Sequence, residues 1–252
     1  MVYTCAYWAA AGTLDEAQEA KLELVCQKLG LKPGMTVLDI GCGWGSFMKY
    51  ACEKYGVRCV GYSLSRMQTE LGRTLCQGLP IEFIEKDYRE ITGQFDRVVS
   101  IGMLEAVGHK NFRSYMEVVE RSLRDDGLAV IQTMGGNWST YYTEKWYDTY
   151  IFPNGLIPSI AQLGSAMEGL LVMEDWHNFG PDYDRTLMAW NSNFQKAWPE
   201  LSAKYPERFK RTWEFYLQSF AGGFRARNTQ LWQLVVSKAH GSGTSKVYGR
   251  IR

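Results

Sequence analysis

The fold is decided by the stretch Met35-Thr-Val-Leu-Asp-Ile-Gly-Cys-Gly-Trp-Gly45. Its apolar first half, residues 35–40, predicts a short buried strand. Glycines at positions 41, 43 and 45 follow, and the pattern of residues 46–54 predicts a helix. A glycine has no Cβ atom, so a ligand can lie against its backbone, and the first turn of a helix offers free N–H groups. The stretch therefore predicts a ligand-binding turn between a strand and a helix.

Strands and helices alternate along the chain on both sides of this turn. A helix is expected over 14–29, before the first strand, and two more over 65–77 and 112–123. The other expected strands cover residues 57–61, 81–85, 95–101 and 128–133. Such alternation is typical of βαβ units, whose parallel sheet is covered by helices on both faces. We therefore expect an α/β, Rossmann-like fold with a mostly parallel, doubly wound sheet and ligands beyond the carboxyl ends of its strands.

The alternation is interrupted after the fifth expected strand. Residues 137–171 are rich in Trp and Tyr and end in an apolar helical pattern over 156–171, which we interpret as a helical lid insertion. The sheet resumes near 172–174. The remaining expected elements are helices over 184–197 and 207–221 and an antiparallel last strand over 231–237. The predicted organisation is one domain over 1–239 and a mobile, polar tail over 240–252.

Composition limits the class of protein. The chain has 252 residues, of which 46% are hydrophobic, and this is enough for a full core. Its 28 Lys+Arg and 27 Asp+Glu give a formal charge of +1, which argues against a dedicated nucleic-acid-binding protein. No apolar run approaches the roughly 18 residues of a membrane span, and no signal-peptide pattern is visible. The six cysteines form no Cys-x-x-Cys pair, so we expect no metal site and reduced thiols in a cytoplasmic protein.

The glycine spacing distinguishes two classes of ligand. The dinucleotide fingerprint G-x-G-x-x-G would need glycine at position 46, where the chain has Ser46. Glycines at 41, 43 and 45, with Asp39 two residues ahead of the first, look like the first motif of class I S-adenosylmethionine methyltransferases. We expect the Asp39 carboxylate to stand near the methionine ammonium of that cofactor. Gln68, one helical turn beyond the second strand, is placed to bond the ribose, and Asp87 follows the third strand, where adenine contacts are common; an ordinary turn role for Asp87 is an equal alternative.

Several separated motifs agree in order with one family. They are Tyr3-Thr-Cys-Ala-Tyr-Trp8, Leu38-Asp-Ile-Gly-Cys-Gly-Trp-Gly45, Gly61-Tyr-Ser-Leu-Ser65, Gly102-Met-Leu-Glu-Ala-Val-Gly108, Tyr150-Ile-Phe-Pro-Asn-Gly155, Met173-Glu-Asp-Trp-His-Asn-Phe-Gly180, Tyr183-Asp-x-Thr-Leu-x-Ala-Trp190 and Phe224-Arg-Ala-Arg227. Together they resemble the cyclopropane-fatty-acid synthase family from residue 2 to about 238. The combination is far more specific than the glycine turn alone.

The resemblance implies an enzyme that transfers a methylene group from S-adenosylmethionine to the cis double bond of an unsaturated acyl chain in a membrane phospholipid. In that chemistry a bound bicarbonate removes a proton from a carbocation as the ring closes. The family's bicarbonate site corresponds here to Cys5, Glu105, Gln132, the backbone at Met134, and Tyr183. Its cofactor site corresponds to Tyr3, Thr4, Asp39, Gly41, Gly43, Ser63, Leu64, Ser65, Gln68, Asp87, Tyr88 and Ile101.

The residue types at the implied bicarbonate site are chemically coherent. Glu105 follows the fourth expected strand and Gln132 lies on the fifth, so both are expected at the carboxyl end of the sheet. Tyr183 and Gln132 can donate hydrogen bonds to a bicarbonate, and Glu105 can accept one from its O–H. A carboxylate repels a neighbouring anion unless a proton lies between them. Aromatic side chains at Trp8, Tyr147, Trp176, Phe179 and Tyr183 are expected to stabilise the cation, although packing in the core explains each one singly as well.

Two departures from the family pattern bear on the product. The better-known bacterial synthases carry histidine at the positions of Gln132 and Ala106, and the chain is more similar here to the fatty-acid methylase branch. Glutamine keeps a donor but cannot shuttle a proton. A cysteine that is sometimes given a catalytic role corresponds to Phe220, so a covalent mechanism has no candidate nucleophile there.

The alternatives left open are a methyl- or methylene-branching fatty-acid methyltransferase that uses the same site, a small-molecule methyltransferase, and a lipid-binding module without activity. The apolar stripe over 156–171 lines an acyl tunnel, enters the headgroup layer, or packs on the protein's own core. Bacterial relatives carry an additional N-terminal domain that helps them form dimers and dock on the membrane. We expect a cytoplasmic protein with weak peripheral association at the inner membrane, and a homo-oligomer is an open possibility.

Overall fold

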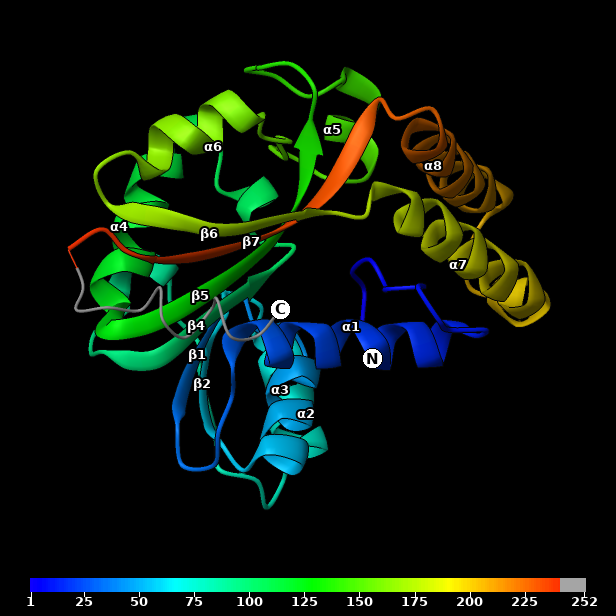
Figure 1. Cartoon of the computed structure of the whole chain (residues 1–252). Coiled ribbons are helices and arrows are strands. Elements are labelled where there is room, and N and C mark those ends of the chain that lie inside the picture. Colours follow the sequence, from blue (N-terminus) through cyan, green and yellow to red (C-terminus); the bar gives the residue numbers. More distant parts are fainter. Residues whose placement is uncertain (241–252) are drawn as a thin grey trace.

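A single mixed sheet organises the chain in the computed structural model, which describes residues 1–240 (Figure 1). The strands are β1 Thr36–Ile40, β2 Arg58–Tyr62, β3 Ile81–Ile84, β4 Phe95–Ile101, β5 Leu123–Gly136, β6 Leu171–Asn178 and β7 Thr229–Lys238. Their order is β3-β2-β1-β4-β5-β7-β6. Neighbours among β1 to β5 run parallel, whereas β7 runs antiparallel to both β5 and β6. The expected mostly parallel sheet with an antiparallel last strand is confirmed.

Helices cover both faces of the sheet and extend beyond one end of it (Figure 1). They are α1 Leu14–Leu29, α2 Ser46–Tyr55, α3 Arg66–Leu75, α4 Phe112–Ser122, α5 Lys145–Tyr150, α6 Ile160–Met167, α7 Gly180–Leu201 and α8 Glu207–Arg225. Short 3-10 turns lie at η1 Tyr88–Glu90, η2 Leu104–Ala106 and η3 His109–Asn111. Figure 1 shows α1, α2 and α3 on one face and α4 with α6 on the other, while α7 and α8 pack as a pair beside α5. Each face of the sheet has its own apolar core.

Local sequence explains how α1 begins and ends. Thr13 accepts a hydrogen bond from the backbone of Glu16, whose side chain accepts one from the backbone of Thr13, and this capping box starts the helix. The helix ends at Gly30, whose φ of 57° favours a residue without a side chain. One face of α1 is buried, and besides apolar residues it carries Gln18 and Lys21.

The segment after β5 differs from the expectation. The apolar pattern over 156–171 forms a helix only over Ile160–Met167, because Gly169 turns the chain with a φ of 73° and β6 begins at Leu171. Leu163, Met167 and Leu171 belong to the apolar core that α4 also helps to form. Of the three roles left open for this stripe, packing on the protein's own core is the one that the structure bears out for these residues. The predicted tail, apart from its first residue, lies outside the described residues.

Candidate active site

The N-terminal segment is held in place by α7. Thr186 Oγ1 accepts hydrogen bonds from the backbone N–H of Ala6 at 3.1 Å and from Trp8 Nε1 at 2.9 Å. The same hydroxyl donates to the carbonyl oxygen of Asp182, and the backbone N–H of Trp8 donates to the Asp182 carboxylate at 2.7 Å. These bonds place the segment from Tyr3 to Trp8 at the carboxyl end of the sheet.

The glycine turn is shaped for close contact. Gly41 has a φ of 86°, and a Cβ atom there would lie 2.7 Å from Met103 Cγ. Gly45 has a φ of 78°, and its Cβ would lie 2.5 Å from Phe83 Cζ. Both positions therefore need glycine for backbone conformation and for space. The turn is a cradle of the kind that lets a ligand reach the backbone at the start of α2.

A cavity of about 230 Å³, here called the small cavity, opens above this turn. Seven of the predicted cofactor-binding residues line it: Tyr3, Thr4, Asp39, Gly41, Gly43, Gln68 and Ile101. Asp39 is 3% exposed, and burial raises the pKa of its carboxyl to about 7. Lys21 favours the charged form of this carboxyl, but within residues 1–240 no hydrogen bond or ion pair joins the two. The carboxylate is therefore open to a positively charged group such as the methionine ammonium of S-adenosylmethionine. The residues present therefore fit that cofactor.

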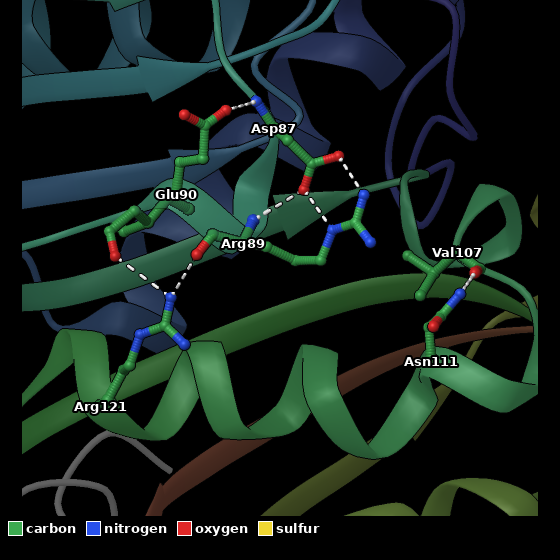
Figure 2. A network of polar contacts seen from close by, with 7 residues as sticks. Asp87, Arg89, Glu90, Val107, Asn111 and Arg121 are labelled. Carbon is green, nitrogen blue, oxygen red and sulfur yellow. Dashed lines mark hydrogen bonds and ion pairs between the residues drawn. The ribbon is translucent and has the colours of Figure 1, made fainter.

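Five other predicted cofactor-binding residues do not line the small cavity: Ser63, Leu64, Ser65, Asp87 and Tyr88. They lie in the loops after β2 and β3. The Asp87 carboxylate is already paired with Arg89, which donates to it from Nε at 2.8 Å and from Nη2 at 3.0 Å (Figure 2). These bonds lower the pKa of Asp87. Arg121 donates to the backbone carbonyl of Arg89, so the turn is fixed from α4 as well. A turn role for Asp87 accounts for all of these contacts, and its adenine contact stays a prediction.

A second cavity, here called the large cavity, has a volume of about 590 Å³. All five residues of the predicted bicarbonate site line it: Cys5, Glu105, Gln132, Met134 and Tyr183. Most of its wall is apolar or aromatic, with lining residues that include Tyr142, Tyr147, Ile151, Phe152, Leu156, Ile157, Phe220 and Leu231. Tyr3, Thr4 and Gly102 line both cavities. The two cavities therefore meet at the N-terminal segment.

Glu105 has one oxygen that is fixed and one that is not. Its Oε1 accepts a hydrogen bond from the backbone N–H of Met134 at 2.7 Å. Its Oε2 is buried and has no hydrogen-bond partner within residues 1–240. Burial raises the pKa of Glu105, and hydrogen bonding by the backbone of Met134, by its own backbone and by the Thr133 side chain opposes that rise. An unpartnered buried carboxyl oxygen indicates a missing polar ligand, because leaving it unpaired is costly. A bicarbonate fits there, provided that a proton lies between the two anions.

Gln132 belongs to a chain of buried amides. Its Oε1 accepts a hydrogen bond from Gln233 Nε2 at 2.9 Å, and its own Nε2 donates to the Cys5 carbonyl at 3.5 Å. This arrangement fixes the amide so that its N–H groups face the N-terminal segment. Cys5 is 1% exposed and its Sγ donates to the Ala6 carbonyl. Burial raises the pKa of the Cys5 thiol well above its ordinary value, so the group is a neutral thiol.

The expected aromatic wall is only partly assembled. Tyr183 and Tyr147 line the large cavity, and the Tyr183 ring packs on Phe224 with ring centres 4.6 Å apart. Burial raises the pKa of Tyr183 well above its ordinary value, so its hydroxyl stays protonated. The other three lie elsewhere: Trp8 beneath Arg185, Trp176 against Trp232, and Phe179 in the core of α7 and α8. For these three, packing is the role that the contacts support.

Three residues at the site were not predicted. Lys21 lines the small cavity, Gln18 Nε2 donates to the Thr4 carbonyl at 2.8 Å, and Thr186 anchors the N-terminal segment. Positions 18 and 21 fall on the apolar face of α1 together with Leu22, and polar residues on such a face are the signal that was available. Thr186 lies inside the motif that begins at Tyr183, but a threonine hydroxyl carries no distinctive pattern.

Comparisons with known proteins agree with this geometry. A family model described as mycolic acid cyclopropane synthetase matches residues 1–234. The chain belongs to the mycolic acid cyclopropane synthetase family. It is 49% identical to the cyclopropane-fatty-acyl-phospholipid synthase of Escherichia coli strain K12 over 243 residues, which are 96% of this chain. The chain spans 64% of the length of that relative.

Further relatives extend the similarity. The chain is 32% identical over 256 residues to a protein named "Probable fatty acid methyltransferase" from Pseudomonas putida, and it covers 65% of that protein. A solved structure of mycolic acid cyclopropane synthase CmaA1 complexed with SAH and CTAB superposes with a TM-score of 0.87 at 31% identity, covering 93% of this chain and 89% of that one. The expected family and the expected class I S-adenosylmethionine-dependent methyltransferase fold are both confirmed.

Proposed function

We propose that the chain is the catalytic part of an enzyme that transfers a methylene group from S-adenosylmethionine to the cis double bond of unsaturated phospholipid acyl chains and so forms cyclopropane rings. One observation carries the proposal: a small charged cavity above the glycine turn meets a large, mainly apolar cavity at Tyr3, Thr4 and Gly102. A charged methyl donor and a hydrocarbon chain need two such compartments side by side. A small, polar methyl acceptor would need no apolar cavity of about 590 Å³.

The small cavity holds and orients the donor. S-adenosylmethionine, when bound there, supplies an electrophilic methyl group on a positively charged sulfur. The Asp39 carboxylate balances the ammonium charge of the donor. Gly43 lines the cavity with nothing within 4 Å of its Cβ position, so the ligand can approach the backbone there. Holding the methyl donor and the alkene in the right geometry makes their reaction effectively unimolecular.

The large cavity controls the fate of the cation. The alkene electrons form the new carbon–carbon bond, the sulfur leaves with its electron pair, and a carbocation remains on the acyl chain. Bicarbonate, when bound beside Glu105 Oε2, supplies the base for the proton that the added carbon loses as its C–H electrons close the ring. The Tyr183 hydroxyl and the Gln132 amide donate hydrogen bonds toward that anion, whereas the Met134 N–H is already used by Glu105. The apolar wall keeps water from capturing the cation.

A branching fatty-acid methyltransferase is the second candidate, and one feature favours it. The chain has Gln132 and Ala106 where the better-known synthases have histidines, and Gln132 is locked by Gln233. A base that removes the hydrogen on the methyl-bearing carbon of the same cation gives a methyl-branched alkene. If that hydrogen first moves as a hydride to the cationic carbon, proton loss from the added carbon gives a methylene branch. Both products add one carbon, so only the number of remaining double bonds separates them.

We also propose that the edge of the large cavity meets a membrane surface, on the cytoplasmic side. Tyr142 lines that cavity although it is 80% exposed, and Trp138 and Tyr141 in the same loop are 79% and 67% exposed. Tyr and Trp are enriched where protein meets the lipid–water interface.

No helix of the described chain is long and apolar enough to cross a membrane. All six cysteines are free and buried, which supports a reducing compartment. In this proposal residues 137–157 form a lid over the acyl chain.

The experiment is incubation with S-adenosylmethionine and vesicles of cis-unsaturated phospholipid, with bicarbonate either supplied or removed. Mass spectrometry of the acyl chains follows, before and after ozonolysis, which cleaves an alkene and leaves a cyclopropane ring intact. A saturated product with one added CH₂ supports ring formation, and a product with one added CH₂ and an alkene supports branching. Product formation that does not change when bicarbonate is removed contradicts the role of that base. Methyl transfer only to oxygen or nitrogen acceptors contradicts both candidates.

A further inference from the structure

Lys21 is a buried charge inside the small cavity. Its side chain projects from the apolar face of α1 and is 1% exposed. Its Nζ donates to Thr4 Oγ1 at 2.8 Å, which is the one hydrogen bond it makes within residues 1–240. Burial lowers the pKa of the Lys21 ammonium to about 8. A lysine buried to this extent is costly unless an anion accepts its remaining protons.

Asp39 and Lys21 face the same cavity with opposite charges. Each favours the charged form of the other, but no hydrogen bond or ion pair joins them in the described part of the chain. Both line the cavity of about 230 Å³ together with the glycine turn. The pair therefore presents one buried anionic group and one buried cationic group that a ligand can bridge. The ligand with matching charges is the zwitterion of an α-amino acid.

We infer that Lys21 binds the α-carboxylate of the donor's methionine moiety, opposite the ammonium that Asp39 binds. The inference rests on the proposed function, because it takes S-adenosylmethionine as the ligand of the small cavity. Two of the three protons on Lys21 Nζ are available for the carboxylate, and the third holds Thr4. Thr4 lines both cavities, so binding of the carboxylate also fixes the wall between the donor and the acyl chain.

A purely structural role for Lys21 makes a different prediction. If Lys21 only held Thr4, its loss would weaken every ligand of the small cavity to the same extent, with or without a carboxylate. If Lys21 binds the carboxylate, its loss weakens only ligands that carry one. Ligands that differ in this one group therefore separate the two roles, and they do so without any measurement of turnover.

The experiment measures dissociation constants by calorimetry for S-adenosylmethionine and for decarboxylated S-adenosylmethionine, which lacks only the carboxylate. 5′-Methylthioadenosine, which lacks the whole amino-acid end, serves as the reference. In the wild-type chain we expect the carboxylate to tighten binding. In Lys21→Met we expect roughly a 10- to 100-fold loss for S-adenosylmethionine and almost none for the decarboxylated analogue, as for a lost charge-assisted hydrogen bond. Lys21→Gln keeps a donor for Thr4, and it decides the question if Lys21→Met does not fold.

Lys28 provides a matched control. It is a second buried lysine of α1, and burial lowers its pKa to about 8 as well. It pairs with Asp175 at 3.4 Å and does not line the small cavity. Lys28→Met should keep wild-type affinity for all three ligands, and thermal melting should show that each variant is folded.

The outcomes separate this inference from the proposed function. Equal losses for both forms of the donor in Lys21→Met or Lys21→Gln overturn the role of Lys21 while leaving the proposed function intact. A wild-type chain that binds neither S-adenosylmethionine nor 5′-methylthioadenosine contradicts the proposed function itself. A loss confined to the ligand with the carboxylate supports both.

Discussion

The small cavity and the large cavity draw their walls from very different stretches of chain. Every residue that lines the small cavity lies within residues 1–102, whereas the large cavity is lined by residues from Tyr3 to Leu231. The small cavity brings together the glycine turn and Asp39 at the end of β1, Lys21 on α1, and a few apolar side chains of the same stretch. The large cavity consists of aromatic and aliphatic side chains from loops and helices that meet only in the folded chain.

The difference indicates that the two cavities have different functions. The first cavity is fixed by backbone conformation, so it recognises one charged ligand and has little tolerance for change. The second is shaped by side chains that can be replaced singly, so it can accept acyl chains that differ in length or in double-bond position. Changes in the two cavities should therefore affect different measurements, and the following predictions test this.

The largest effect is expected for Glu105→Gln. The amide keeps the shape of the side chain, but it removes the negative charge and changes the hydrogen bonds at the unpartnered oxygen. We expect product formation to fall about 10²- to 10⁴-fold, the range for loss of acid–base function. The dissociation constant for S-adenosylmethionine should stay within about twofold of the wild type, because Glu105 does not line the small cavity. Acyl-chain mass spectrometry and calorimetry give the two values.

Glu174→Gln is the control for that substitution. Glu174 accepts a hydrogen bond from Ser237 at 2.6 Å and lines neither cavity. Its variant should retain wild-type activity. If Glu105→Gln reduced cofactor binding as strongly as turnover, the division between the two cavities would be wrong.

The next effect is expected for Gly41→Ala. The added Cβ meets Met103 at 2.7 Å, and the φ of 86° strains any residue with a side chain. We expect the free energy of unfolding to fall by about 2–4 kcal/mol and affinity for the cofactor to fall with it. Gly34→Ala is the control, because Gly34 has a φ of 84° but nothing within 4 Å of its Cβ position. Gly34→Ala should lose only the part of the free energy of unfolding that is due to the positive φ. If thermal melting showed equal losses of stability in Gly41→Ala and Gly34→Ala, the contact with Met103 would not contribute to the effect.

The same contrast explains what the sequence could predict. Asp39 and the glycine turn lie within one strand–turn–helix unit, so their spacing predicted both the fold and the site. The residues of the large cavity could be named only through a family resemblance, because no local pattern brings Cys5 close to Gln132 or Tyr183. Their meeting depends on hydrogen bonds across long sequence separations, such as those of Thr186 with Ala6.

The points that the sequence left open, and the residue that it missed, have physical causes of the same kind. Periodicity in 156–171 indicated an apolar face correctly, but it could not show whether that face covers α4 or a ligand. Trp176 and Trp8 have the composition of a cation-binding wall, yet each fills a gap in the core. Lys21 was missed because a single lysine on a helix usually reaches solvent, and its burial depends on where the segment around Thr4 is anchored.

A smaller effect is expected from pH. Burial raises the pKa of Asp39 to about 7, and binding of the ammonium requires the ionised carboxylate. Affinity for S-adenosylmethionine should therefore fall about tenfold for each pH unit below about 7, and it should fall again above about 8 as Lys21 loses its proton. In Asp39→Asn the affinity at pH 8 should be lower and its dependence between pH 5 and 7 should disappear. Calorimetry at four pH values measures both slopes.

The stability of the unliganded chain depends on pH in the opposite direction to its affinity for the cofactor. Between about pH 4 and 7 the folded, unliganded chain holds a proton on Asp39 that the unfolded chain has released. That stabilisation is complete below the ordinary pKa and is lost as pH rises through about 7. The difference in the free energy of unfolding between the wild type and Asp39→Asn should show this slope when it is measured by denaturant melts without cofactor. An affinity that is independent of pH in the wild type would contradict the assignment of Asp39 to the ammonium.

The smallest effect is expected for Trp138→Ala, at the edge of the large cavity. Trp138 is 79% exposed, so its loss should change the free energy of unfolding by less than about 0.5 kcal/mol. Partial burial of an indole in the lipid interface contributes on the order of 1 kcal/mol, so vesicle binding should fall roughly fivefold. Flotation with unsaturated phospholipid vesicles measures this. Met67→Ala is the control, because Met67 is 82% exposed on α3 and lines neither cavity. An equal loss in both variants would mean that exposed apolar side chains bind lipid wherever they lie, and that the loop beside Tyr142 is not the surface through which the acyl chain enters.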